Sequence, residues 1–120
     1  MVHLDYRDAR PIYIQIVEGF RAQIMAGVLQ PGEKLPSVRE LAMELSINPN
    51  TIQRAYRQLE ALGWIATMPG KGCFVSGLPE YAAEEQRELL RAFDEAAAAL
   101  LQRGMTRQEL TERLMKEEET

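Results

Sequence analysis

The 120-residue sequence has little of what metal centres, disulfides and catalytic sites are built from. It contains a single cysteine, Cys73, and a single histidine, His3, far apart in the chain. One cysteine cannot form an internal disulfide, and this pair has none of the spacings typical of metal ligands. No Ser-His-Asp set and no pair of catalytic carboxylates can be assigned. We therefore expect no metal, no cofactor and no enzymatic activity.

Two further absences concern membranes and secretion. No apolar run approaches the roughly 18 residues that a membrane span requires. The stretch from Val2 to Arg10 is polar and lacks the basic region and apolar core of a secretory signal. We expect a cytoplasmic protein without membrane association. The hydrophobic content of 46% is enough for one packed core in a chain of this length.

An overall excess of positive charge is also missing, because the formal net charge is −4. An evenly acidic chain would be a poor nucleic-acid binder, since phosphate contacts require a local positive potential. The charge is uneven, however. Residues 1–78 carry eight Lys and Arg against seven Asp and Glu, whereas residues 79–120 carry six against eleven. The acidity belongs to the last third, and a basic surface in the first part remains compatible with DNA binding.

Apolar residues at helical spacing predict two helices in the first third of the chain. The first helix is expected over residues 11–26, with a proline at its first position. The second is expected over 38–45, because Ser37 and Glu40 have the spacing of a capping box. A loop of about nine residues rich in turn formers separates the two helices.

A third helix is predicted over residues 49–62, after a tight turn. The Asn48 side chain is a good helix cap, and Pro49 suits the first helical position because no backbone donor is lost there. Two short strands are expected next, over 64–67 and 73–76, joined by a glycine-containing hairpin turn. Three helices followed by a hairpin is the order of a winged helix-turn-helix domain.

The third helix has an apolar face and an outer face of hydrogen-bonding and basic residues. Amide side chains can bond adenine, arginine can bond guanine, and a threonine methyl can touch thymine in the major groove. The outer face is formed by Asn50, Gln53, Arg54 and Arg57, with Thr51 on its flank. A plain solvent-exposed face, with the two arginines paired to Glu60, is the alternative interpretation of this helix alone.

Two other segments are expected to join this helix on a DNA duplex. Arg39 is placed to contact phosphate, and the hydroxyl and backbone N–H of Ser37 lie at a helix start suited to an anion. At the hairpin tip, Lys71 stands between Gly70 and Gly72, where a thin backbone favours entry into the minor groove.

A break at residues 77–79 separates a second segment from this domain. Helices are expected over 80–103 and from Thr106, which forms a capping-box pair with Glu109. So short a segment cannot bury its own apolar side, which a second copy of the chain would cover. We expect a homodimer through residues 80–116 and hence a palindromic operator. An effector would bind at the dimer interface or between the domains.

Three spaced motifs resemble the GntR family of bacterial transcription regulators: LPSVRELA at residues 35–42, NPNTIQRAY at 48–56 and GKGCFV at 70–75. The Asn-Pro-Asn-Thr sequence and the short tail are most similar to the YtrA-type subfamily. The resemblance implies operator binding as a homodimer, with Arg39, the start of the third helix and the wing tip on DNA. It also implies control of transporter operons in many members.

The chain departs from the family pattern at four positions. Met68 and Pro69 stand where relatives often have arginines, and Cys73 replaces the usual threonine, so we expect a weaker contact of the wing with phosphate. Gln53 replaces an arginine of many members, so the base preference is expected to differ.

The sequence thus predicts a mainly α protein, with a winged helix-turn-helix DNA-binding domain over 1–78 and a two-helix dimerisation segment, with effector sensing as a further role, over 79–120. The function expected is sequence-specific transcriptional regulation, with repression as the leading mode. A protein–protein interaction module on the same scaffold is the alternative function. A subunit of an enzyme is a more distant one.

Overall fold

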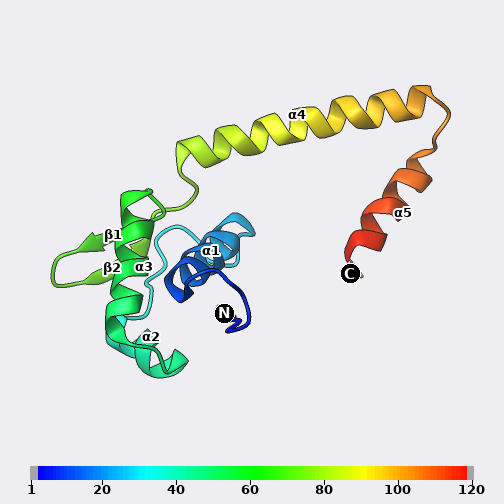
Figure 1. The fold of residues 1–120 in the computed structure, drawn as a ribbon. Coiled ribbons are helices and arrows are strands. Elements are labelled where there is room, and N and C mark those ends of the chain that lie inside the picture. The colour runs from blue at the N-terminus through cyan, green and yellow to red at the C-terminus, as the bar shows by residue number, and fades with distance from the viewer. Residues whose placement is uncertain (1–2, 119–120) are drawn as a thin grey trace. The chain divides into compact units, whose positions relative to one another are not determined.

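The computed structural model describes residues 3–118, with side chains up to residue 116. The chain divides into two compact units, and the boundary lies between Pro79 and Glu80. The first unit contains three helices and a hairpin, and the second contains two helices (Figure 1). The mainly α, winged helix-turn-helix fold is therefore confirmed. In chain order the elements are α1 (Ile12–Met25), α2 (Val38–Leu45), α3 (Pro49–Ala61), β1 (Ile65–Met68), β2 (Gly72–Val75), α4 (Glu80–Gln102) and α5 (Arg107–Glu118).

The core of the first unit lies between α1 and α3. Apolar residues three and four positions apart share one face of a helix, so each helix presents a continuous apolar stripe to the other. The Phe20 and Tyr56 rings meet edge to face, with centroids 5.9 Å apart. The buried side chains of this interface are Ile16, Val17, Phe20 and Ile24 from α1 and Ile52, Ala55, Tyr56 and Leu59 from α3.

One start residue was predicted wrongly: Pro11 caps α1 and is not its first helical residue. Its extended backbone (ψ 149°) keeps it outside the helix, while its carbonyl accepts hydrogen bonds from the Ile14 and Gln15 N–H groups.

Tyr56 also connects α3 to the loop that precedes α2. Its hydroxyl donates a hydrogen bond of 2.7 Å to the Pro36 carbonyl oxygen. Burial raises the pKa of Tyr56 above its usual value, with smaller contributions from Cys73 and Glu40. The hydroxyl therefore stays protonated and remains a donor at neutral pH. The start of α2 is held against α3 by this bond.

The turn between α2 and α3 forms as predicted. The Ser37–Glu40 capping box is present at the start of α2, and the Asn48 Oδ1 atom accepts a hydrogen bond of 2.9 Å from the Asn50 N–H at the start of α3. Between the helices Ser46 takes a left-handed conformation (φ 56°), which ends α2. This short turn sets the relative placement of the two helices.

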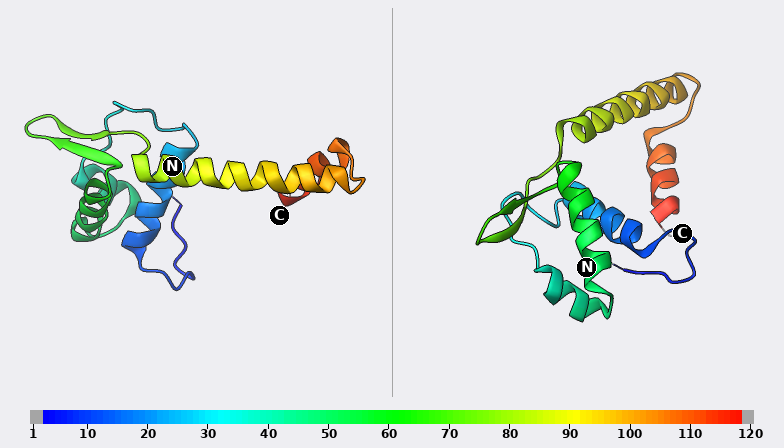
Figure 2. Two further views of the ribbon diagram at one scale, coloured as in Figure 1. Left: turned by 90° about the horizontal axis from the view of Figure 1, so that it is seen from above. Right: turned by 60° about the vertical axis from the view of Figure 1, so that its left-hand side comes forward.

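In the hairpin, which we call the wing, β1 begins one residue later and β2 one residue earlier than predicted. The Trp64 N–H donates to the Leu59 carbonyl oxygen at 2.9 Å, and Gly63 has a positive φ of 88°. Trp64 thus closes the end of α3, and the ladder starts at Ile65 opposite Val75. In Figures 1 and 2 the wing extends away from the three helices.

A pairing that sequence periodicity did not predict anchors the wing. The loop before α2 runs along the outer edge of β2, where the Leu35 N–H donates to the Cys73 carbonyl oxygen at 2.9 Å. The Val75 N–H donates in turn to the Glu33 carbonyl oxygen at 2.8 Å. Lys34 is therefore held beside the wing, opposite Phe74.

The second unit consists of α4 and α5, joined at Gly104 (φ 103°). The predicted capping box is present, because the Glu109 N–H donates to the Thr106 hydroxyl oxygen and the Glu109 carboxylate accepts from the Thr106 N–H. Among the helices in residues 3–118, none combines the length and the apolar character needed to cross a membrane.

Replacing Tyr56 with Phe tests the link between α3 and the α2 loop. The variant leaves the half-buried Pro36 carbonyl without its donor, and we expect the free energy of unfolding to fall by about 1 kcal/mol. Tyr6→Phe is the matched control, because Tyr6 is 72% exposed, and it should change that value by less than about 0.5 kcal/mol. Urea titration followed by the fluorescence of the buried Trp64 measures both. Equal values for the two variants would contradict the assigned role of the bond.

Candidate nucleic-acid interface

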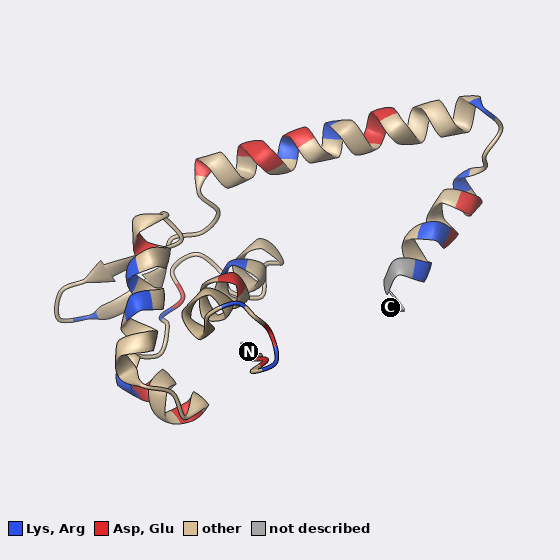
Figure 3. Ribbon diagram, in the orientation of Figure 1, with Lys and Arg blue, Asp and Glu red and all other residues tan. Residues whose placement is uncertain are grey.

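The outer face of α3 is polar and open to solvent. Asn50, Gln53, Arg54 and Arg57 are exposed and Thr51 is half-buried, whereas the opposite side of the helix forms the core. Figure 3 shows Lys and Arg along α3 and at the wing. The structure therefore keeps the hydrogen-bonding groups of this face available to a ligand.

The carboxylate nearest to this face does not neutralise it. The Glu60 Oε2 atom accepts a hydrogen bond of 2.7 Å from the Thr67 hydroxyl of β1. Among the described residues, neither Arg54 nor Arg57 forms an ion pair, and the ion pairs present are those of Arg10 and Arg87. The two α3 arginines therefore contribute positive charge to this surface without being tied up in ion pairs.

Arg54 is held by α1. Its guanidinium carbon lies 3.8 Å from the centroid of the Tyr13 ring, and its Nη2 atom donates to the Tyr13 hydroxyl at 3.2 Å. The sequence pattern gave no sign of this contact, because Tyr13 and Arg54 lie 41 positions apart in the chain and on different helices.

Arg39 lies in the first turn of α2. It is exposed and lines a surface hollow together with Ser46, Ile47 and Pro49. The fold thus brings Arg39 close to the start of α3. In helix-turn-helix domains the two helices contact the same DNA site, so this proximity is expected of a DNA-binding surface.

A groove of about 360 Å³ separates the start of α2 from the wing. Ser37 and the wing residues Gly70, Lys71 and Gly72 line it, so these predicted site residues are brought together. Lys34, which was not among the predicted site residues, lines the same groove. Its place depends on the backbone pairing of the preceding loop with β2, for which the sequence has no periodic signal.

The two glycines of the wing tip have different reasons to be there. Gly70 has a positive φ of 75° in the turn, a conformation that residues with a Cβ rarely adopt. Gly72 also has a positive φ, of 113°, and a Cβ there would lie 3.0 Å from the Lys34 Cε atom. The Lys34 side chain thus passes close to the backbone of Gly72.

One donor expected to face an anion is already in use. The Ser37 backbone N–H donates to the Glu40 carboxylate at 3.3 Å, and the Ser37 hydroxyl oxygen accepts from the Glu40 N–H at 3.1 Å. The sequence suggested two donors at Ser37, the backbone N–H and the hydroxyl. The capping box occupies the backbone N–H and leaves the hydroxyl able to donate to a ligand.

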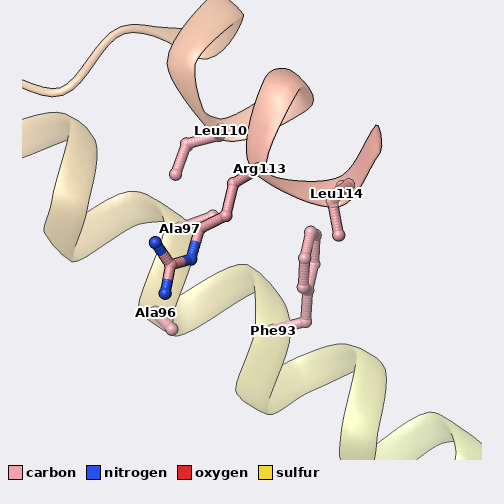
Figure 4. Close-up of a pocket in the computed structure, with 6 residues that line it drawn as sticks. All are labelled: Phe93, Ala96, Ala97, Leu110, Arg113 and Leu114. Atoms are coloured by element: carbon pink, nitrogen blue, oxygen red, sulfur yellow. The ribbon is translucent and has the colours of Figure 1, made fainter. Parts of the chain in front are cut away.

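The second unit has a small apolar groove of its own between α4 and α5. Its volume is about 180 Å³, and in Figure 4 Phe93 of α4 and Leu114 of α5 face each other across it. Arg113 extends from α5 toward α4 in the same view. The lining is completed by Ala96, Ala97 and Leu110.

Comparison with known protein families places this surface in context. Residues 12–75 match the family described as bacterial regulatory proteins, gntR family. The chain belongs to this family. As a member of the gntR family it is a DNA-binding transcription regulator of the winged helix-turn-helix type, and the resemblance noted in its sequence is confirmed.

Two relatives from Bacillus subtilis illustrate the likeness. YhcF, an uncharacterized HTH-type transcriptional regulator, is 38% identical over 111 residues, which are 89% of each chain. The HTH-type transcriptional repressor YtrA is 45% identical over 76 residues, which are 63% of this chain and 58% of the repressor. The expected similarity to the YtrA type is thereby confirmed.

Solved structures of the same fold include regulators with and without DNA. A transcriptional antiterminator from Listeria monocytogenes is 33% identical, with a TM-score of 0.66 over 100% of this chain and 90% of that one. YtrA from Sulfolobus acidocaldarius is 35% identical, with a TM-score of 0.60 over 82% and 97%. AraR(DBD), in complex with an operator, is 28% identical, with a TM-score of 0.53 over 62% and 92%.

Side chains that could bind a metal ion do not cluster in the part of the chain that the structure describes. There, no group of three or more His, Cys, Asp and Glu side chains is placed to hold a metal ion. The free thiol of Cys73 is half-buried and lies 3.4 Å from the Thr67 hydroxyl oxygen, within the wing.

Substituting Lys34 tests whether the groove beside the wing belongs to the DNA-binding surface. Lys34→Ala removes one cation that we expect to lie against phosphate, so affinity should fall to a similar extent on all DNA sequences, and the slope of log K against log salt should flatten by about 1 per chain. Fluorescence anisotropy at several salt concentrations measures both. Lys116→Ala, which removes an exposed lysine of α5, is the control and should leave the slope unchanged. An unchanged slope for Lys34→Ala would remove this residue from the interface.

Proposed function

We propose that this gntR-family regulator is a transcriptional repressor that binds a palindromic operator as a homodimer and reads bases with the outer face of α3. The observation that carries the proposal is that face itself, whose amides and arginines have no acidic partner among the described residues. The operator complex of the structurally similar AraR(DBD) supports DNA as the ligand.

In this proposal the groups on α3 read base edges. Asn50 and Gln53 bond adenine, the Thr51 methyl meets thymine, and Arg54 and Arg57 bond guanine. Each well-formed bidentate contact discriminates between bases by about 1–3 kcal/mol. Asn48 acts at the same helix start, where its capping bond orients the first turn of α3 toward the duplex.

The surrounding groups hold the phosphate backbone. Arg39 lies beside the start of α3, and its guanidinium contacts a phosphate at one edge of the DNA major groove. Lys71, at the wing between Gly70 and Gly72, contacts the duplex on the other side. The Ser37 hydroxyl donates its free proton to a phosphate oxygen. These contacts set the register in which α3 meets the bases.

The apolar surface of α4 supports dimerisation through residues 80–116. The spacing of four and three residues places Leu89, Phe93, Ala96 and Leu100 on one side of the helix, the pattern of a helix that packs against another. Leu89 is 71% exposed and Phe93 50% exposed in the single chain. A second copy buries this side, whereas two helices alone leave it in water.

A two-fold dimer explains how an acidic chain binds DNA. Two-fold symmetry requires inverted half-sites whose centres lie about 34 Å apart, one turn of the duplex. The surplus of Asp and Glu belongs to residues 79–120, whereas residues 1–78, which include the proposed DNA-binding surface, carry one more Lys or Arg than Asp and Glu.

An effector, where one acts, binds at the interface of the dimer. The α4–α5 groove of one chain measures about 180 Å³, which is below the roughly 300 Å³ of a typical ligand pocket. A second copy of α4 would enlarge and close it. We assign the protein no catalytic reaction and place it in the cytoplasm, with its DNA. From the similarity to YtrA-type regulators we infer that it controls a transporter operon.

Selection of bound sequences from a random DNA pool tests the proposal directly. We expect an enriched palindrome with half-sites one helical turn apart. If each chain uses three cations (Arg39, Arg54 and Lys71), the dimer neutralises about six phosphates, and log K against log salt should have a slope of about −5. A pool that remains unenriched at low ionic strength would contradict DNA reading by α3.

The alternative function, a protein–protein module, is separated from DNA reading by a double substitution. Asn50→Ala with Arg54→Ala should abolish the preference for the selected palindrome while the chain stays folded, because both changes lie on the exposed face of α3. Unchanged affinity for the palindrome would favour the protein–protein module.

A charge placed on the apolar side of α4 tests the dimer. Leu89→Glu should convert a dimer into a monomer, because two carboxylates would otherwise be buried at the interface. Ala98→Glu introduces the same side chain at an exposed position on the opposite side of α4 and should leave the dimer intact. Sedimentation equilibrium gives the mass of each. A wild-type chain that sediments at 13.6 kDa at tens of micromolar would overturn the dimer.

A further inference from the structure

Arg54 is the arginine of the α3 outer face for which the structure gives an aromatic partner. The Arg54 guanidinium lies over the Tyr13 ring, with its Cζ atom 3.8 Å from the ring centroid. This distance is well within the roughly 6 Å over which a cation and an aromatic face attract. A hydrogen bond of 3.2 Å from Arg54 Nη2 to the Tyr13 hydroxyl accompanies the stack. Two contacts therefore act on one side chain.

These contacts use the face of the guanidinium and leave most of its edge open. The group has five N–H donors in a planar fork, of which the bond to Tyr13 takes one. Bidentate bonding to guanine O6 and N7 needs two donors along one edge. A stacked Arg54 thus retains the donors it needs for a base.

Tyr13 stands on a helix that is packed into the core. It is half-buried on α1, two and three positions before the buried Gln15 and Ile16, and α1 packs along α3 through the core. A rigid aromatic surface on a packed helix restricts the rotamers of a long side chain before any ligand arrives. Less conformational entropy is then lost when the arginine binds.

We propose that Tyr13 is a positioning residue for base recognition, which orients the Arg54 guanidinium edge toward one base pair of each half-site. The inference rests on the proposed function, since it assumes that the outer face of α3 reads DNA. It extends the recognition surface to α1, a helix that contributes none of the residues assigned to bases above.

A double-mutant cycle between Tyr13 and Arg54 tests the proposal on the selected operator. Arg54→Ala first identifies the base pair at which sequence preference is lost. Tyr13→Leu should then reduce preference at that same base pair by roughly three- to thirtyfold per half-site, the range expected for a cation–aromatic contact. In the Arg54→Ala background, Tyr13→Leu should have little further effect.

The conservative variant separates the ring from the hydroxyl. Tyr13→Phe keeps the aromatic face and loses the hydrogen bond, so we expect it to retain preference to within about threefold of the wild type. The salt slope should not change in either Tyr13 variant, because the charge of Arg54 remains. Far-ultraviolet circular dichroism and thermal unfolding show whether each variant is folded, and Tyr13→Phe keeps the test valid where Tyr13→Leu does not fold.

The outcomes are distinct from those of the proposed function. A palindrome that is bound with preference in the wild type, but for which the effects of Tyr13→Leu and Arg54→Ala simply add, overturns the positioning role and leaves DNA reading intact. Loss of preference spread evenly over all base pairs in a folded Tyr13→Leu variant also overturns it. If the wild-type chain has no sequence preference at all, the proposed function fails first.

Discussion

The packing of α1 against α3 is the constraint on which the rest of the first unit depends. Once Ile52, Ala55, Tyr56 and Leu59 are buried against α1, the opposite side of α3 has to face solvent, because both sides belong to one rigid helix. The packing of the core therefore turns the outer face of α3 toward solvent. Mutations that loosen this core would disturb recognition without touching any group that meets DNA.

Hydrogen bonds help to place the other two parts of the surface against α3. The Tyr56 hydroxyl holds the start of α2 through the Pro36 carbonyl, and backbone pairing of residues 33–35 with β2 holds the wing. Both connections converge on the loop before α2, which carries Lys34 and leads into Ser37. This loop links α3, α2 and the wing, and the groove between the last two is its direct result.

The two units differ in charge. The one carboxylate on α3, that of Glu60, accepts a hydrogen bond from Thr67 of β1. The second unit carries the acidic surplus together with an apolar side on α4 that a lone chain leaves in water.

Much of this followed from the residues alone. Apolar spacing, the Ser37 and Thr106 capping boxes, and the Asn48-Pro49 turn are local signals, since each depends on residues within one or two turns of chain, and the helices they mark are present in the structure. The contacts that give the site its detail are different: Lys34 beside Gly72, and Arg54 stacked on Tyr13, join segments distant in sequence. No periodicity records such pairs, because they exist only after α1, α3 and the wing have packed. The sequence by itself determined which faces are apolar and where the helices begin, and the tertiary structure alone decided which side chains meet across them.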